Sequence, residues 1–166
     1  MSARVVRIVL VLIAVAVAGC DQGTKRWAEE ELAGQAPVTV VQGRAELTYT
    51  QNPGSAFRFD RLAPEVVRAP LLWGSAIAVL GVLGVAWWRQ RRVDVPAVAG
   101  ALIAGGAAGN LIDRAARGYV VDFVHVHGWP VFNVADVALV AGGALVLVAA
   151  LRARPAAASP PGRPSL

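Results

Sequence analysis

The stretch FNVADVALVAGGALVLVAAL, residues 132–151, decides the fold of this chain. Apart from Asn133 and Asp136 it is built from apolar and small residues, and about 20 such residues are what a helix needs to cross the hydrocarbon core of a bilayer. A carboxylate in such a helix costs about 2.5 kcal/mol or more on insertion scales. The stretch therefore predicts a membrane-spanning helix whose first turn carries a functional acid.

Three further apolar blocks precede this one. Hydrophobic residues make up 56% of the sequence and charged residues only 16%, a composition typical of membrane proteins rather than of soluble domains. The third block contains Gly105, Gly106 and Gly109, small residues that allow helices to pack closely in a membrane. The predicted fold class is an integral membrane α-helical protein with four transmembrane helices. These spans cover about residues 5–20, 70–88, 95–112 and 132–151.

Basic residues predict how these spans are oriented. Short segments rich in Lys and Arg stay in the cytoplasm, so both termini are predicted to be cytoplasmic and the longer loops, about 21–69 and 113–131, extracytoplasmic. The net charge of +5 is explained by this anchoring and by anionic phospholipids, and no nucleic-acid partner is expected. The basic residues concerned are Arg4, Arg7, Arg89, Arg91, Arg92, Arg152 and Arg154.

The first outward loop contains signals for local structure. Its helical and β-branched runs, separated by Gly34 and Gly43, predict a short interfacial helix and a small extracytoplasmic sheet, or β-cradle. The expected elements are a helix over 24–32 and strands over 38–41 and 46–50, followed by a turn at Asn52-Pro53-Gly54. Residues 1–152 are expected to form a single membrane-embedded domain. The tail, 153–166, is rich in Pro, Ala and Ser and is expected to be disordered.

Polar side chains are expected to meet at the outer ends of the spans. Residues three or four apart share a face of a helix, and several polar residues have this spacing. They are Asp21 with Lys25, Asn110 with Asp113 and Arg114, and Asn133 with Asp136. Polar residues without a common role would scatter in depth, so this convergence indicates a site at the outer membrane surface.

Asp122 and Asp136 supply the two carboxyl groups that peptide hydrolysis can use. Two carboxyl groups that approach closely share a proton and titrate in coupled steps. One then acts as general base on a water while the other, protonated, polarises the scissile carbonyl. By spacing alone Asp113 is a third candidate, although an acid at a polar helix end next to Arg114 can simply stabilise the fold.

Other chemistries have less support in the sequence. His125 and His127 could form a metal site with Asp122, but two histidines without a cysteine cluster make a poor zinc site. Ser55 and Lys25 could form a Ser–Lys dyad, and nothing in the sequence favours it over the aspartates. We expect neither a metal nor a cofactor.

Two other functional classes remain open at this point. Cys20 follows Val17-Ala18-Gly19, the pattern of a bacterial lipoprotein signal, which would make the chain a lipid-anchored protein. Three further hydrophobic spans argue against that interpretation. Intramembrane acids also serve as proton relays in transporters, but the polar groups here gather at one surface instead of forming a path across the membrane.

Five motifs, in this order, resemble the bacterial lipoprotein signal peptidases, also called signal peptidase II. The motifs are Asp21-Gln22-Gly23-Thr24-Lys25, Asn52-Pro53-Gly54-Ser55-Ala56-Phe57, Gly109-Asn110-Leu111-Ile112-Asp113-Arg114, Gly118-Tyr119-Val120-Val121-Asp122-Phe123 and Phe132-Asn133-Val134-Ala135-Asp136. Each is weak alone. Five in order on a frame of four spans, from Asp21 to about Val140, are highly specific.

The resemblance implies a metal-independent aspartyl endopeptidase of the bacterial cytoplasmic (inner) membrane, with its active site at the extracytoplasmic face. Such enzymes remove signal peptides from prolipoproteins by cleaving just before a diacylglyceryl-modified cysteine. Asp122 and Asp136 match the catalytic pair. Asn52, Gly54, Asn110, Arg114 and Asn133 match residues that line the substrate site, and Asp21 and Lys25 match a supporting pair to which we add Asp113. The implied partners are prolipoproteins, membrane phospholipids and globomycin-type inhibitors, and a monomer is expected.

Overall fold

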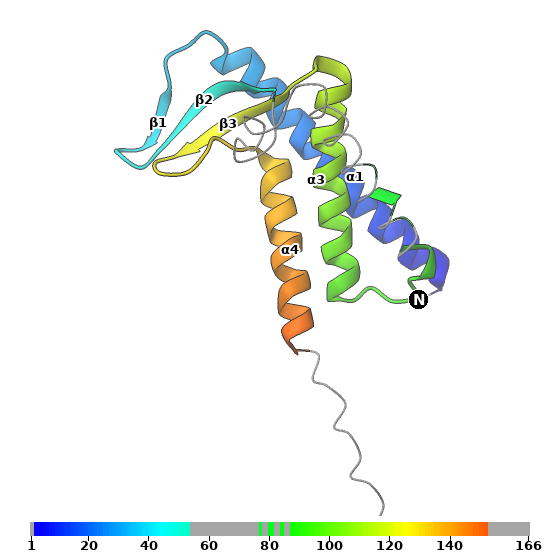
Figure 1. Ribbon diagram of the computed structural model, residues 1–166. Coiled ribbons are helices and arrows are strands. Elements are labelled where there is room, and N and C mark those ends of the chain that lie inside the picture. The colour runs from blue at the N-terminus through cyan, green and yellow to red at the C-terminus, as the bar shows by residue number, and fades with distance from the viewer. Residues whose placement is uncertain (1, 54–76, 78–79, 82–83, 85–86, 153–166) are drawn as a thin grey trace, which may run out of the picture.

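The computed structural model describes residues 2–53, 77, 80–81, 84 and 87–152. Its elements are α1 (Ala3–Leu32), β1 (Val38–Val41), β2 (Ala45–Asn52), α3 (Val95–Arg117), β3 (Val120–Val126) and α4 (Val134–Arg152). Figure 1 shows the long helices side by side, with the strands at one end of the bundle. Among the described residues, α1, α3 and α4 are long and apolar enough to cross a bilayer. Gly54, Ser55, most of the expected span 70–88 and the tail 153–166 lie outside the described residues.

α1 is one continuous helix of 30 residues. The separate helix expected over 24–32 is therefore wrong, because these residues continue the helix that contains the first predicted span. Asp21 and Lys25 explain why the helix continues through this polar segment. Their side chains pair at 2.7 Å across one turn and are fully buried. Because each charge is paired with the other inside the protein, neither requires contact with water.

α3 packs against both α1 and α4, and glycines bring the backbones close together. A Cβ on Gly105 would lie 2.7 Å from the Ala14 carbonyl oxygen in α1, and a Cβ on Gly106 would lie 2.5 Å from the Ala135 carbonyl oxygen in α4. A Cβ essentially never comes within 3.0 Å of a heavy atom that does not belong to its own or an adjacent residue. The expectation that these small residues allow close helix packing is confirmed.

The three strands form an antiparallel sheet in the order β1-β2-β3. β1 confirms the strand predicted over 38–41, and β2 contains the strand predicted over 46–50. Near Leu32, at the end of α1, Ala28 packs with Phe123 of β3. The sheet is thereby fixed to the end of the helix bundle.

Residues 113–131, expected to form an extracytoplasmic loop, contain the end of α3 and the strand β3. α3 continues to Arg117, and Gly118, with a φ of +79°, ends the helix in the left-handed conformation before β3 begins. The first four residues of β3, Val120 to Phe123, are all buried. Because both faces of this part of the strand are covered, it lacks the alternation of polar and apolar residues that identifies a strand in a sequence.

A short bridge joins β3 to the start of α4. The Phe132 N–H donates to the Val124 carbonyl at 2.9 Å, and the Phe132 carbonyl accepts from the N–H groups of Phe123 and Val124 at 3.1 and 2.9 Å. Phe132, which precedes Asn133, is thus hydrogen-bonded to β3, the strand that carries Asp122. The strand and the first turn of α4 are held in a fixed relation.

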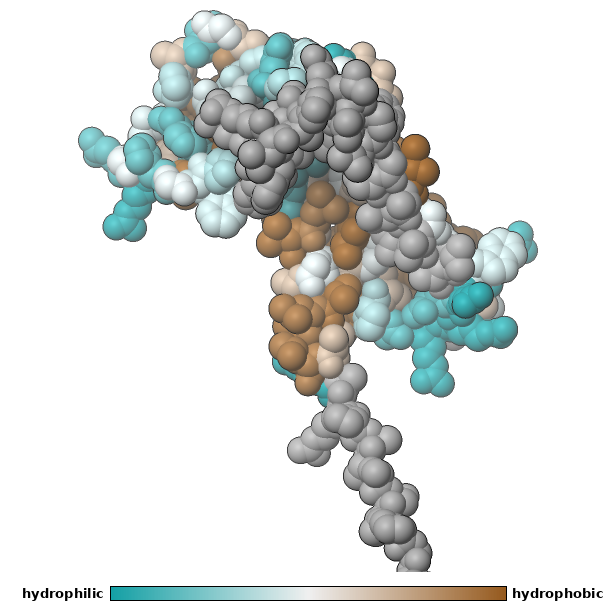
Figure 2. Space-filling model, viewed as in Figure 1, coloured by the Kyte–Doolittle hydropathy of each residue, from teal (hydrophilic) through white to brown (hydrophobic). Residues whose placement is uncertain are grey.

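Apolar side chains cover much of the outer surface of α1 and α4. Leu12 and Val15 in α1, and Val140 and Leu147 in α4, each expose 60% or more of their surface. Figure 2 shows apolar residues gathered over α4 below the sheet and polar residues over the sheet. Exposed apolar surface of this extent is suited to contact with lipid.

Candidate active site

Asp122 and Asp136 come from different elements and meet at the sheet end of the bundle. Asp122 lies within β3 and is 3% exposed, and Asp136 lies in the first turn of α4. Both contact Asn133. Its side-chain amide donates to Asp122 Oδ1 at 2.6 Å, and its backbone N–H donates to Asp136 Oδ2 at 3.3 Å. Through this shared residue the two carboxylates form one site.

Two further asparagines contact the remaining carboxylate oxygens. Asn52, at the end of β2, donates to Asp122 Oδ2 at 2.9 Å. Asn110, in α3, donates to Asp136 Oδ1 at 2.9 Å. Each of the four carboxylate oxygens therefore accepts a hydrogen bond. Three of the predicted lining residues surround the pair directly, whereas Gly54 lies outside the described part of the chain.

The environment of Asp122 favours its protonated form. Burial raises the pKa of this carboxyl from 3.8 to about 6, and the negative charge of Asp136 acts in the same direction. Hydrogen bonds from Asn52 and Asn133 and the positive charge of Lys25 oppose the increase. A carboxyl in this range can hold a proton at mildly acidic to neutral pH, as a member of a proton-sharing pair does.

The start of α4 is fixed by capping. Asn133 Oδ1 accepts the Asp136 N–H at 3.0 Å while Asp136 Oδ2 accepts the Asn133 N–H, the reciprocal pattern of a capping box. Asp21, from α1, accepts the Ala135 N–H at 2.9 Å. These contacts determine the position of Asp136, which also lies at the helix end where the dipole favours negative charge.

Lys25 lies next to this network and is fully buried. Its ammonium group is 2.7 Å from Asp21 Oδ2, 2.9 Å from Asp113 Oδ2 and 2.9 Å from Asn110 Oδ1. An ammonium group has three donors, so all three are used. The sequence predicts the pairing of Asp21 with Lys25 from their spacing, but not that both charges are buried.

Asp113 connects three elements. Its Oδ2 accepts the Val121 N–H of β3 at 3.0 Å, and its Oδ1 accepts from Gln22 of α1 at 2.9 Å and pairs with Arg117 at 2.7 Å. These contacts fix the backbone of β3 at Val121, the residue that precedes Asp122. Gln22 and Arg117 were not among the predicted site residues, although the spacing of four between Asp113 and Arg117 is a signal that could have identified Arg117.

Arg114 places a positive charge near the carboxylates. Its guanidinium donates to the Asn110 carbonyl at 3.3 Å, and it interacts electrostatically with Asp136 and Asp122. His125, by contrast, pairs with Glu46 of β2 at 2.7 Å and stacks on His127. Within the described ranges, no group of three or more His, Cys, Asp or Glu side chains is arranged to hold a metal ion.

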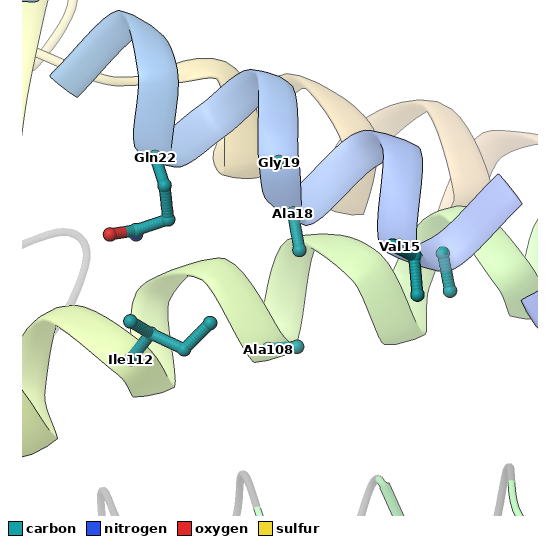
Figure 3. Close-up of a pocket in the computed structure, with 7 residues that line it drawn as sticks. Val15, Ala18, Gly19, Gln22, Ala108 and Ile112 are labelled. Atoms are coloured by element: carbon teal, nitrogen blue, oxygen red, sulfur yellow. The ribbon is translucent and has the colours of Figure 1, made fainter. Parts of the chain in front are cut away.

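An apolar hollow of about 420 Å³ lies between α1 and α3 (Figure 3). It is lined by Ala14, Val15, Ala18, Gly19, Gln22, Ala108 and Ile112. Neither Asp122 nor Asp136 lines it. Six of its seven lining residues carry no polar side-chain group, so it cannot supply the acid–base chemistry that the carboxylate pair offers, and the candidate active site is the carboxylate cluster.

The chain is similar to known bacterial membrane enzymes over most of its length. The family model described as Signal peptidase (SPase) II matches residues 13–152. The lipoprotein signal peptidase of Syntrophomonas wolfei is 40% identical over 131 residues, which are 79% of this chain and 85% of that protein. The lipoprotein signal peptidase of Geobacter sulfurreducens is 40% identical over 138 residues, or 80% of this chain and 84% of that protein.

The fold has a counterpart among solved structures. A bacterial membrane enzyme determined by the in meso method at 1.9 Å resolution superposes with a TM-score of 0.75 and 28% identity, covering 88% of this chain and 94% of that one. With its long apolar helices and small sheet, the chain is an integral membrane α-helical protein. The match to the family model over 13–152 and the identity to these relatives establish that the chain belongs to the signal peptidase II family.

Proposed function

We propose that this chain is an aspartyl endopeptidase that removes signal peptides from prolipoproteins, cleaving immediately before a diacylglyceryl-modified cysteine. Asp122 and Asp136 are its catalytic pair. The observation that carries the proposal is the carboxylate cluster itself, in which β3 and α4 each supply one acid and Asn133 contacts both. Such a pair, in a membrane protein of this family, is suited to hydrolyse a peptide bond close to a lipid anchor.

The mechanism follows from a shared proton. The ionised carboxylate takes a proton from a water whose oxygen attacks the scissile carbonyl carbon, while the protonated partner donates to the carbonyl oxygen. The tetrahedral intermediate then collapses: the carboxyl that took the water proton gives it to the leaving nitrogen, the carbon–nitrogen bond breaks, and the other carboxylate takes back the proton from the hydroxyl group that becomes the new carbonyl. The pair ends with the one proton it began with, so no other acid or base is needed.

Neighbouring donors prepare the site for this chemistry. Asn52, Asn110 and Asn133 hold the carboxylate oxygens in place without adding a charge. Arg114, close to both acids, is placed to stabilise negative charge that develops on the substrate. Inhibitors of the globomycin class are expected to compete with substrate for this cluster.

The membrane would align the substrate with the site. We place the protein in the bacterial cytoplasmic membrane as a monomer of one domain, residues 1–152, with four spans, both termini in the cytoplasm and the sheet outside. The acyl chains of a lipidated substrate remain in the bilayer, which confines the cleavage site to the level of the carboxylate cluster. Holding two reactants at one depth lowers the entropic cost of bringing them together.

The test is cleavage of a diacylglyceryl-modified prolipoprotein by the purified protein in detergent, with a chelator present. Asp122→Asn and Asp136→Asn are each expected to reduce the rate by at least about 10²-fold, the range for loss of a general acid or base. Glu46→Gln is the matched control, because it removes a carboxylate that pairs with His125 and not with the cluster.

Three results would count against the proposal. Turnover retained in either Asp variant removes that residue from the catalytic pair. Equal cleavage of the same protein without its lipid removes the lipidated cysteine from the recognition signal. Absence of cleavage by folded wild-type protein would leave the proton-coupled transporter as the function to test, by proton flux in liposomes.

A further inference from the structure

The side-chain amide of Asn110 donates to Asp136 through its nitrogen. If the amide were rotated by half a turn, its oxygen would face Asp136 instead, so the orientation of this amide has to be fixed. Its Oδ1 accepts from Lys25 at 2.9 Å and from Asn133 at 3.2 Å, which leaves Nδ2 for Asp136 Oδ1. An ammonium group can only donate. Whatever faces Lys25 must therefore be the oxygen of the amide.

The contact from Asn133 fixes this orientation less firmly. At 3.2 Å it is longer than the contact from Lys25, and the same nitrogen also lies 3.3 Å from the Val121 carbonyl and 2.6 Å from Asp122. A hydrogen bond from a charged group is also stronger than one between neutral groups. Lys25 is thus the main determinant of which way the Asn110 amide points.

We propose that Lys25 is a positioning residue for catalysis: by holding Asn110 Oδ1 it directs the amide N–H to Asp136 and so favours the ionised form of the carboxylate pair. The inference rests on the proposed function of that pair. With the amide reversed, an oxygen would face Asp136, and only a protonated carboxyl could bond to it. Lys25 then acts on the reaction through Asn110, without touching the reacting atoms.

Other charges face the same region from each packed element. Asp21 shares α1 with Lys25, Asp113 and Arg114 come from α3, and the pair itself comes from β3 and α4. Lys25 also favours the ionised form of Asp122 through its charge alone. A useful variant must therefore remove the hydrogen bond to Asn110 while leaving the net charge of the region unchanged.

The double variant Asp21→Asn with Lys25→Met meets this requirement. It removes one negative and one positive charge, and Asn at position 21 retains an acceptor for the Ala135 N–H. Asp113 keeps its contacts with Gln22, Arg117 and Val121. Replacing a buried ion pair by neutral groups of similar size is often tolerated, so this variant is expected to fold.

The measurement is the pH dependence of kcat/KM for cleavage of the lipidated prolipoprotein. We expect the acidic limb of the double variant to move up by about one pH unit, the size of effect that one charged neighbour or hydrogen bond exerts on a carboxylate. Glu29→Gln is the control. It removes another contact between α1 and α3, the pair with Arg117 at 3.3 Å, and should leave the acidic limb in place.

A merely structural Lys25 would lower thermal stability and leave the acidic limb where it is. A folded, active double variant with the wild-type acidic limb therefore overturns the proposal. If that variant does not fold, Asn110→Leu replaces it, and an unshifted limb there is equally decisive because the link from Lys25 to Asp136 runs through this amide. Inactive wild-type protein would instead refute the peptidase function, so the two failures are distinguishable.

Discussion

In the described part of the chain, three asparagines donate hydrogen bonds to the two carboxylates. Asn52, Asn110 and Asn133 donate to them, and Lys25 contacts Asn110 instead of either acid. A cation bonded directly to a carboxyl lowers its pKa by one to three units. Bonded to both acids, it would tend to ionise both, which the proposed proton-sharing mechanism does not allow. A hydrogen bond from a neutral amide is weaker than one from a charged group, so it can fix the geometry while one carboxyl of the proposed pair stays protonated.

Asp122→Asn is expected to stabilise the protein at neutral pH while abolishing cleavage. The pKa of Asp122 is about 6 in the folded state, whereas that of an unperturbed Asp carboxyl is 3.8. Between these values the folded state binds more protons than the unfolded state, so this group makes stability fall as pH rises. The cost above pH 6 is on the order of 2–3 kcal/mol.

The measurement is the thermal unfolding midpoint of wild-type and Asp122→Asn protein in detergent at pH 5 and pH 7.5. The difference in favour of the variant should be larger at pH 7.5. A difference that is the same at both pH values would show that burial of a charged Asp122 does not destabilise the fold.

At the scale of single residues, the sequence identifies the charged residues of the site better than it identifies the residues that they contact. Asp136 can be identified because a carboxylate is costly in an apolar stretch, and Asp21 with Lys25 because of their spacing. The contact between Asp21 and the Ala135 N–H joins residues 114 positions apart. No local pattern encodes such a contact, because it depends on how α1 packs against α4.

At the scale of single elements, Asn133 has two separable roles. Its Oδ1 caps α4 and its Nδ2 donates to Asp122. Asn133→Ser should keep the cap, since serine is a good N-cap residue, but the shorter side chain loses the amide donor. We expect near wild-type stability with cleavage reduced by about 10²-fold.

Asn133→Ala is the companion variant, because it loses both roles. It should be less stable than Asn133→Ser by about 1 kcal/mol, with cleavage impaired at least as much. Denaturation midpoints and initial rates, measured in the same detergent, separate the two effects. Equal stability of the Ser and Ala variants would mean that capping by this side chain does not stabilise α4.

Gly106→Ala tests the close packing of α3 on α4. The added Cβ would lie 2.5 Å from the Ala135 carbonyl oxygen, so the helices must separate at the residue next to Asp136. We expect a loss of about 1–3 kcal/mol together with lower activity. Gly143→Ala is the matched control in α4, where nothing lies within 4 Å of the added Cβ, and helix propensity favours alanine by up to about 1 kcal/mol. Thermal unfolding compares them, and equal midpoints would contradict the packing argument.

The same packing explains which elements the sequence could predict. β1 and β2 have β-branched runs bounded by Gly34 and Gly43. β3 is buried by neighbours from distant parts of the chain. Its sequence therefore lacks the alternation of polar and apolar residues that would distinguish a strand from any other buried segment. The continuity of α1 depends in the same way on burial of Asp21 and Lys25, which become acceptable inside a helix only when Asp113 and Asn110 supply their partners.

At the scale of the molecule, the described elements are arranged between two ends of the helix bundle. α1 and α3 run toward the sheet and α4 runs away from it (Figure 1). Asn52 lies at the sheet end, where it contacts Asp122, whereas Trp87 packs at the opposite end against a cluster that contains Val6. Asn52 and Trp87 therefore lie at opposite ends of the bundle.

This arrangement makes a prediction about orientation that the single cysteine helps to test. In a Cys20→Ser background, Gln42→Cys would place a thiol in the turn between β1 and β2, and Val93→Cys would place one ahead of α3. Both positions are exposed. With the basic residues in the cytoplasm, a membrane-impermeant maleimide should label position 42 in intact spheroplasts and position 93 only after lysis. The reverse pattern would invert the proposed topology, and labelling of both positions in intact spheroplasts would exclude that topology. The proposed function requires the expected pattern, because the carboxylate cluster can meet an exported prolipoprotein only if the sheet end of the bundle faces outward.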